Sequence, residues 1–335
     1  KLGIHWFRQG LRLSQNPSLQ ALSKKVDEII PIYIYDPKQR IGSVSKWWLE
    51  KSLKSLKDNI EKKNGKLNIF IGNPIDIIPS LILDNKIEHF YWNRLYDHYS
   101  ITRDKEIKSS LKLKDIECET FNGFLLNEPW NIQNKSGTFF KVFTPYWRHC
   151  NEITRNKKFN NQNHNIRFFD TNLKNSKKLH DLNLINKTMK WTNKIHIHWI
   201  PGENNAQVQL NKFIDHKANN YSIGRDRPDN NLTSKLSPYL HFGEISPIEV
   251  YNKVNSSKKI NLQNKEKFLS EIGWRDFAYN LLYYYPDMIK NPIQKKFNNF
   301  PWLKDNKNLK KWQKGLTGVP IVDAGMRQLY EVGWM

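Results

Sequence analysis

The first 125 residues alternate short apolar runs with stretches of helical periodicity, and this alternation restricts the fold more than any other feature of the chain. The apolar runs typical of buried strands are Leu2–Phe7, Ile29–Tyr35, Leu67–Ile71, His89–Trp92 and Ile116–Phe121. Between the second and third runs, residues 43–63 carry apolar side chains at helical spacing. Strands that alternate with helices predict an α/β fold with a doubly wound, Rossmann-like parallel sheet. No Gly-x-Gly-x-x-Gly loop follows the first run, which excludes the standard dinucleotide fingerprint.

The pattern changes near residue 130. Residues 130–195 are rich in Asn and Lys and predict a long surface connection with a short helix near Thr144–Thr154. Helical periodicity then returns, in Glu203–Asn219, Ser246–Lys258, Lys265–Tyr285 and Val322–Val332. We therefore divide the chain into an α/β domain (residues 1–128), an interdomain linker (129–198) and an all-α domain (199–335).

Positive charge is concentrated in the second part of the chain. The formal net charge is +22, with a surplus of +5 in residues 1–130 and +17 in residues 131–335. An excess so uneven favours a polyanion as the partner of the second part. Basic chains without a nucleic-acid partner are also common, so composition alone leaves both readings open.

Cysteine content and hydropathy narrow the class of protein. Cys118 and Cys150 lie far apart in no metal-type spacing, so we expect reduced thiols and no metal site. No run approaches the roughly 20 apolar residues that span a bilayer. No charged-then-apolar leader precedes the first strand, and we expect a cytoplasmic protein without a membrane partner.

A first chemical motif runs from Tyr221 to Pro228 and continues from Thr233 to Pro247. Thr233, Ser234 and Ser237 place hydroxyls beside backbone N–H groups, and Pro238 fits the first turn of a helix. Hydroxyls and amides at a helix start make an anion site suited to a pyrophosphate. An ordinary Ser/Thr cap is the alternative, and it is favoured when the motif is taken alone.

A second motif is Glu271-Ile-Gly-Trp274-Arg275-Asp-Phe277, in which Glu271, Trp274 and Arg275 share one helical face. A carboxylate, an indole and a guanidinium on one face indicate a pocket that stacks a base-like ring and holds a phosphate. The alternative is one core aromatic beside a surface ion pair.

A third motif contains Phe300-Pro-Trp302, and the Gly315-Leu-Thr-Gly-Val-Pro320 turn leads into a helix.

The three motifs, in this order and spacing, resemble the photolyase/cryptochrome family. The segments Trp6–Arg12 with Asn16-Pro17, and Val142–Arg148, resemble the same family's N-terminal domain and connector. The resemblance spans the whole chain. It implies an α/β antenna domain, a long linker and a helical domain that binds FAD and DNA.

The resemblance also implies roles for individual residues. The positions that match flavin and flavin-phosphate contacts are Tyr221, Thr233, Ser234, Lys235, Leu236, Ser237 and Phe268. Glu271 matches the carboxylate that bonds the damaged bases, and Trp274 matches the indole that stacks on the pyrimidine dimer. Arg225 and Arg275 match DNA-phosphate contacts, and Trp302 matches the outermost tryptophan of the chain that re-reduces the flavin.

The implied function is light-dependent repair of cyclobutane pyrimidine dimers in double-stranded DNA. Reduced FAD gives one electron to the flipped dimer, the cyclobutane ring splits and the electron returns. Trp274 favours dimer repair, because plant-type cryptochromes carry a smaller aliphatic residue at that position, and Val322–Arg327 and Gly333–Met335 resemble the bacterial class I branch. A cryptochrome-type blue-light receptor is the alternative, and a basic nucleotide-binding or RNA-modifying enzyme without flavin is a weaker third reading.

The chain departs from the family at several points. Family members continue for about a hundred residues after Met335, so we expect an incomplete flavin site, poor stability and no activity from this chain alone. Tyr99 and Ser100 replace an Asn-Glu pair that contacts folate in some members. A second antenna chromophore therefore stays open in presence and identity. The family implies a monomer.

Overall fold

A parallel five-stranded sheet forms the first half of the chain in the computed structural model, which describes residues 1–157, 165–186 and 188–335. The strands are β1 (Leu2–Phe7), β2 (Glu28–Tyr35), β3 (Asn68–Ile71), β4 (His89–Asn93) and β5 (Glu117–Phe121). They pair in the order β3-β2-β1-β4-β5, and all four pairings are parallel. The predicted doubly wound α/β sheet is confirmed, with each strand starting and ending within a residue of the sequence-based bounds.

Helices cover both faces of this sheet because successive side chains of a strand point to opposite faces. They are α1 (Pro17–Leu22), α2 (Ser43–Glu61), α3 (Pro74–Asn85) and α4 (His98–Lys112). Ile4 and Trp6 of β1 join the core beneath α3 and α4, whereas Phe7 joins the core beneath α1 and α2. The near-continuous apolar character of β2 follows from burial on both faces.

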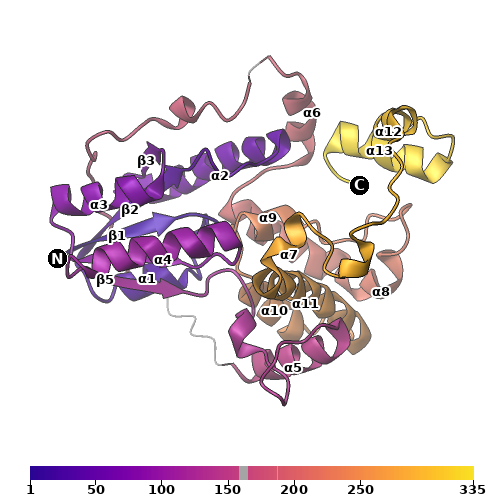
Figure 1. The fold of residues 1–335 in the computed structure, drawn as a ribbon, viewed down its shortest axis with the longest axis horizontal. Helices are drawn as coiled ribbons and strands as arrows, with labels where there is room; N and C mark the ends of the chain where they lie inside the picture. The colour runs from indigo at the N-terminus through magenta and orange to yellow at the C-terminus, as the bar shows by residue number, and fades with distance from the viewer. Residues whose placement is uncertain (158–164, 187) are drawn as a thin grey trace.

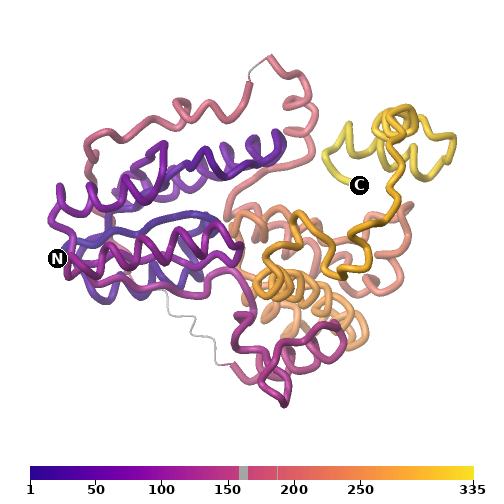
Figure 2. The backbone as a smooth tube through the Cα atoms, in the orientation of Figure 1, coloured from indigo at the N-terminus to yellow at the C-terminus, as the bar shows by residue number. Residues whose placement is uncertain are grey.

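The second half of the chain is helical (Figures 1 and 2). Its helices are α5 (Phe143–Asn156), α6 (Trp191–His198), α7 (Glu203–His216), α8 (Tyr221–Gly224), α9 (Ser237–His241), α10 (Pro247–Ser256), α11 (Leu262–Tyr284), α12 (Asn306–Gln313) and α13 (Pro320–Val332). Short 3-10 turns are Pro129–Asn131, Leu179–Leu182, Ala218–Asn220, Pro286–Ile289 and Lys295–Phe297. The helix predicted near Thr144–Thr154 is present as α5.

Part of the predicted linker is buried, although its polar composition indicates a connection over the surface. Tyr146 and Cys150 of α5 are fully buried and form a small core with Phe277 of α11. Further on, the chain returns to the sheet, where the Phe169 N–H donates to the Ile29 carbonyl at 2.9 Å. The segment predicted as linker also contains residues 158–164 and 187, which lie outside the described residues.

Backbone hydrogen bonds join the two halves directly. The N–H groups of Gly10 and Leu11 both donate to the Phe242 carbonyl, at 3.1 and 3.2 Å. The buried Arg12 guanidinium donates to the carbonyls of Gly243 and Gly123, each at 2.9 Å. These bonds satisfy buried polar groups on both sides, so they fix the loop after β1 against the turn after α9.

One hydrophobic core runs through both halves. It begins under the sheet, includes Trp47, Trp48 and Leu53 of α2, and continues to Leu210 of α7 and Phe268 of α11. Helix α2 therefore belongs to both layers: it covers the sheet and also packs against the helical half.

The C-terminal helices α12 and α13 pack more loosely. They lie at the right of Figure 1, where α13 contacts α6, and their exposed apolar side chains include Leu309, Trp312, Leu316 and Ile321. Among the described residues, no helix has the length and apolar content that crossing a membrane requires.

Candidate functional site

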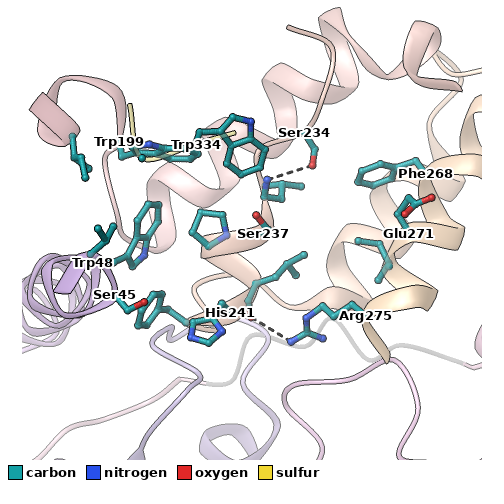
Figure 3. A pocket seen from close by; sticks show the side chains of 18 of the residues that line it. Ser45, Trp48, Trp199, Ser234, Ser237, His241, Phe268, Glu271, Arg275 and Trp334 are labelled. Atoms are coloured by element: carbon teal, nitrogen blue, oxygen red, sulfur yellow. Dashed lines mark hydrogen bonds between the residues drawn. The ribbon is translucent and has the colours of Figure 1, made fainter. Parts of the chain in front are cut away.

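A cavity of about 620 Å³ lies where the two halves meet. Its walls come from the start of α2, the end of α6, the α8–α9 segment, α11 and the Gly333–Trp334 terminus (Figure 3). Its volume is that of a typical small-molecule or cofactor site, and its walls are mainly apolar with a few convergent polar groups. The cavity is therefore the candidate binding site of this chain.

The motif predicted to bind an anion forms one wall of the cavity. Ser234, Leu236 and Ser237 line it, and Pro238 lies in the first turn of α9 as predicted. The Ser234 hydroxyl accepts from the Leu236 N–H at 3.3 Å, and no side chain caps α9. The ordinary helix cap, the alternative reading of this motif, is not what these hydroxyls form.

Two residues of the same motif lie beside the cavity and not in its wall. Thr233 is partly buried and is absent from the lining, as is Lys235. Lys235 has a positive φ of 54°, and its Nζ lies 5.9 Å from the centre of the Trp199 ring. The left-handed residue turns the chain so that Ser234 and Leu236 face the cavity on either side of it.

An aromatic pair forms the wall opposite. Tyr221 and Phe268 both line the cavity, with ring centroids 5.2 Å apart in an edge-to-face arrangement. Phe213 of α7 supports Phe268 from behind at 4.5 Å. The pair offers a rigid apolar surface for a planar ring system.

Glu271 lines the cavity, and its carboxylate is paired with Arg225. Lys267, one turn earlier on α11, approaches the same carboxylate oxygen at 3.7 Å. The Glu271 and Arg225 side chains are each 26% exposed, so the pair lies at the mouth of the cavity and not in its depth. The sequence predicted different partners for these residues, the bases and the DNA backbone; here they hold each other.

Arg275 points inward. Its Nη1 donates to the Phe124 carbonyl at 2.7 Å, and its guanidinium lies 4.2 Å from the centre of the Phe124 ring. The side chain is 17% exposed and lines the cavity. It supplies the cavity with a fixed positive charge.

Asp276, the neighbour of Arg275, holds two backbone segments together. Its Oδ2 accepts from the backbone N–H groups of Leu126 and Asn127, at 2.7 and 3.1 Å. Burial raises the pKa of Asp276 to about 6, and the Arg275 charge opposes that rise. This carboxyl ties α11 to the segment that follows the sheet.

Trp274 does not line the cavity that Glu271 and Arg275 face, although the three residues lie within one turn of α11. Its indole stacks on Phe143 of α5, with centroids 3.7 Å apart and planes 11° apart, and the residue is 47% exposed. Glu271 and Arg275, four residues apart, both face the cavity, whereas Trp274 is turned toward α5 and is absent from the lining. The stacking partner lies 131 positions earlier in the chain, so helical spacing alone does not reveal it.

Trp302 lies outside the cavity on an extended segment. It is 79% exposed, and its ring neighbour is Phe300 at 4.7 Å. This exposed position is what an outermost electron-transfer residue requires. Among the described residues, no ring contact links Trp302 to the cavity wall.

The cavity residues that were not predicted from the sequence include Trp48, Trp199, His241 and Trp334. Trp48 has the helical spacing of an ordinary core residue, and nothing local to it marks a cavity wall. Trp199 and Trp334 meet only through the tertiary fold, at 5.6 Å between centroids. Their one signal in the sequence is the high number of tryptophans, 12 in the whole chain.

A much smaller hollow lies at the carboxyl ends of β1 and β2, where open parallel sheets commonly bind ligands. Its volume is about 60 Å³, the space of roughly two water molecules. Arg8 lines it and is bonded to Asp104 at 2.7 Å, and Tyr99 nearby donates to Asp36. In this conformation the hollow has no room for a chromophore of flavin size.

Two domain families match the chain. Residues 3–163 match the DNA photolyase family, and residues 268–335 match the FAD-binding domain of DNA photolyase. A deoxyribodipyrimidine photo-lyase of Agrobacterium fabrum is 36% identical over 99% of this chain and 70% of its own length. The chain belongs to the DNA photolyase family.

Cryptochromes are relatives of this photolyase-family chain as well. Cryptochrome-2 of Arabidopsis thaliana is 31% identical over the whole chain, which spans 57% of that protein. A bacterial class III photolyase from Agrobacterium tumefaciens has a TM-score of 0.93 at 35% identity, and the chain covers 70% of it. An archaeal photolyase from Sulfolobus tokodaii, whose structure contains two FAD molecules, has a TM-score of 0.80 at 26% identity.

These comparisons confirm the predicted family and fold and qualify the predicted branch. The Val322–Arg327 and Gly333–Met335 patterns resemble class I, yet the photolyase structure at 35% identity is a class III enzyme. The comparisons therefore do not confirm the class I branch.

Proposed function

We propose that this protein is a photolyase that repairs cyclobutane pyrimidine dimers in double-stranded DNA, with reduced FAD in the cavity between its two halves. The observation that carries the proposal is the cavity itself: an apolar, flavin-sized space with an aromatic pair on one wall and serine hydroxyls on another. The likeness to a class III photolyase favours that branch over class I.

The residues of the cavity fit FAD by their chemistry. Ser234 and Ser237 would hold the pyrophosphate together with backbone N–H groups, and Arg275 supplies a compensating charge. Tyr221 and Phe268 would pack against a planar ring. When bound and reduced, FAD supplies the photochemical electron donor, and the protein's own task is to position the lesion and exclude water.

Glu271 and Arg225 would act at the mouth of the cavity, where a base flipped out of the duplex arrives. In their ion pair, Arg225 occupies Oε1 of Glu271. Lesion binding would therefore replace the Arg225 contact with bonds to the bases. Arg225 is then free to contact a phosphate, and Trp274 would leave Phe143 to stack on the dimer. The basic second part of the chain attracts the duplex.

A cryptochrome-type light receptor is the second candidate. Trp274 favours it in one respect, because the indole is turned away from the cavity and toward Phe143. A second chromophore and a monomeric state remain expectations from the family, and the 60 Å³ hollow in the sheet half gives the chromophore no ready site.

Loss of dimers from UV-treated, thymine-rich DNA, compared under blue light and in darkness, tests the function. The full protein that contains this chain, with reduced flavin, should remove dimers in light only, and Glu271→Ala or Trp274→Ala should abolish the loss. Unchanged dimer content in light, despite a bound and reducible flavin, would exclude repair and favour the receptor.

Filling the cavity should displace the cofactor. Ser45 of α2 is partly buried and lines the cavity, so Ser45→Trp introduces a bulky side chain into the space that FAD would occupy. Overpacking of this kind costs about 1–3 kcal/mol, which corresponds to a loss of FAD affinity of roughly 5- to 150-fold. Flavin absorbance per protein after equilibrium dialysis measures it. Ser43→Trp, on the same helix but exposed and outside the cavity, should leave FAD binding unchanged.

Removing Arg225 should weaken DNA binding in a salt-dependent way. Arg225→Ala deletes one proposed phosphate contact, and the slope of log affinity against log salt should fall by about 1. Fluorescence anisotropy with a labelled duplex at several salt concentrations measures that slope. Lys54→Ala is the control, since Lys54 is an exposed residue of the sheet half paired with Asp58. An unaltered slope in Arg225→Ala would remove Arg225 from the DNA interface.

A further inference from the structure

Three tryptophans from distant parts of the chain form one contiguous wall of the cavity (Figure 3). Trp48 of α2 lies 5.5 Å from Trp199, and Trp199 lies 5.6 Å from Trp334, between ring centroids. Trp48 and Trp199 are 4% and 6% exposed. Each of the three faces any ligand that fills the cavity, so each is placed to exchange an electron with a flavin there.

The indole N–H groups of these tryptophans have different partners. Trp48 Nε1 donates to Oε2 of Glu244 at 2.9 Å, and Glu244 is fully buried. Trp199 Nε1 donates to the Val332 carbonyl at 2.8 Å. A one-electron-oxidised indole is a much stronger acid than a neutral indole. A carboxylate can take its proton, whereas a backbone carbonyl cannot.

Glu244 is well suited to take up a proton. Its second oxygen accepts from the Gly202 N–H at 2.6 Å, and no Lys or Arg of the described residues forms an ion pair with it. Burial raises the pKa of Glu244 to about 7, and the nearby Glu203 adds to that rise. Tyr239 is the other titratable group facing it, and burial, then the Glu244 charge, raise the pKa of that phenol.

We propose that Trp48 and Glu244 form a proton-coupled electron donor to a flavin bound in the cavity. This inference rests on the proposed binding of FAD. Trp48 releases one electron to the light-excited, oxidised flavin. Its Nε1–H bond breaks and an O–H bond forms on Oε2 of Glu244, leaving a neutral indole radical beside a neutral carboxylic acid. Return of the electron and proton restores both side chains, so the cycle needs no further reactant.

Proton transfer gives Trp48 a distinct part among the three tryptophans. An electron taken from Trp199 or Trp334 leaves a charged radical that recombines quickly. An electron taken from Trp48 is followed by loss of the proton, which delays recombination because both particles must return. Trp48 is the electron donor, and Glu244 acts through Trp48 by taking up its indole proton. This donor lies on the sheet half, far in sequence from the exposed Trp302.

Time-resolved absorption after a light flash tests the pair in the flavin-loaded full protein at pH 8. The neutral indole radical absorbs differently from its protonated form, so the two are counted separately. We expect the neutral radical in the wild type, and a loss of about 10²-fold in Glu244→Gln, as for removal of a positioned proton acceptor. Trp48→Phe should lose it as well. Trp199→Phe, on the same wall but bonded to a carbonyl, should retain it.

Deuterated solvent provides a measurement that needs no variant and should slow formation of the neutral radical in the wild type. An undiminished yield in Glu244→Gln, or the absence of a solvent isotope effect, overturns the inference while leaving FAD binding and repair intact. A full protein that binds no flavin overturns the proposed function and this inference together.

Discussion

Replacing Gly243 with alanine should lower the free energy of unfolding by roughly 3–4 kcal/mol. Gly243 has a φ of +65°, and a Cβ placed there would lie 2.6 Å from both the N and the Cα of Gly10. Those atoms belong to backbone, so no side-chain rotation relieves the clash. The two loops must separate, which also breaks the hydrogen bonds that Phe242 accepts from Gly10 and Leu11.

Urea unfolding of the purified variant measures the loss. Gly42→Ala is the matched control, because a Cβ at Gly42 meets nothing within 4 Å and its φ of −67° suits any residue. We expect that control to cost no more than about 1 kcal/mol. Equal stabilities of the two alanine variants would show that the loops move apart without cost, and the contact between the halves would not be rigid.

The free energy of unfolding should fall as the pH rises, because of Glu244. Burial holds the pKa of this carboxyl at about 7 in the folded protein, against an ordinary value of 4.5. The stability it contributes is therefore fully present below pH 4.5 and is lost as the pH rises to about 7. The loss amounts to about 3 kcal/mol, because each unit of pKa corresponds to about 1.4 kcal/mol.

The difference in unfolding free energy between Glu244→Gln and the wild type, measured from pH 4.5 to pH 8, isolates this group. The variant should gain about 3 kcal/mol relative to the wild type across that range. The wild-type curve alone is not the test, because burial lowers the pKa of His5 to about 3 and so raises stability over part of the same range. Glu50→Gln on α2 is the control. A difference that stays constant with pH would show that Glu244 is not held in its neutral form by burial.

The sequence predicted the sheet and most helices because their determinants are local. Short apolar runs set the strand bounds, and the 3.6-residue period sets α2, α7, α10 and α11. Ser234, Leu236 and Phe268, which the family resemblance predicts as flavin contacts, line the cavity, and their role there stays a prediction. Their motifs lie on short, well-formed segments whose orientation follows from the backbone.

The local sequence pattern does not predict which side chains from distant segments will contact each other. Trp274 was predicted at the pocket, but its direction depends on Phe143 of another helix. Arg275 turns inward because the Phe124 carbonyl and ring are there to receive it. Trp48 becomes a cavity residue only because α2 extends beyond the sheet to the helical half. In each case the decisive contact joins residues more than 100 positions apart.

The core that passes through α2 has a consequence for how such proteins can recombine. Trp48 packs with ring neighbours from two segments of the helical half: Trp199 after α6 at 5.5 Å, and Tyr239 and Phe242 of the α9 segment at 5.0 and 6.2 Å. A sheet half transplanted onto a relative's helical half would bring this indole without its matched neighbours, and would leave a void or a clash where dense packing is needed. We therefore expect that a stable chimera must exchange the start of α2 together with the segments of the helical half that pack against it.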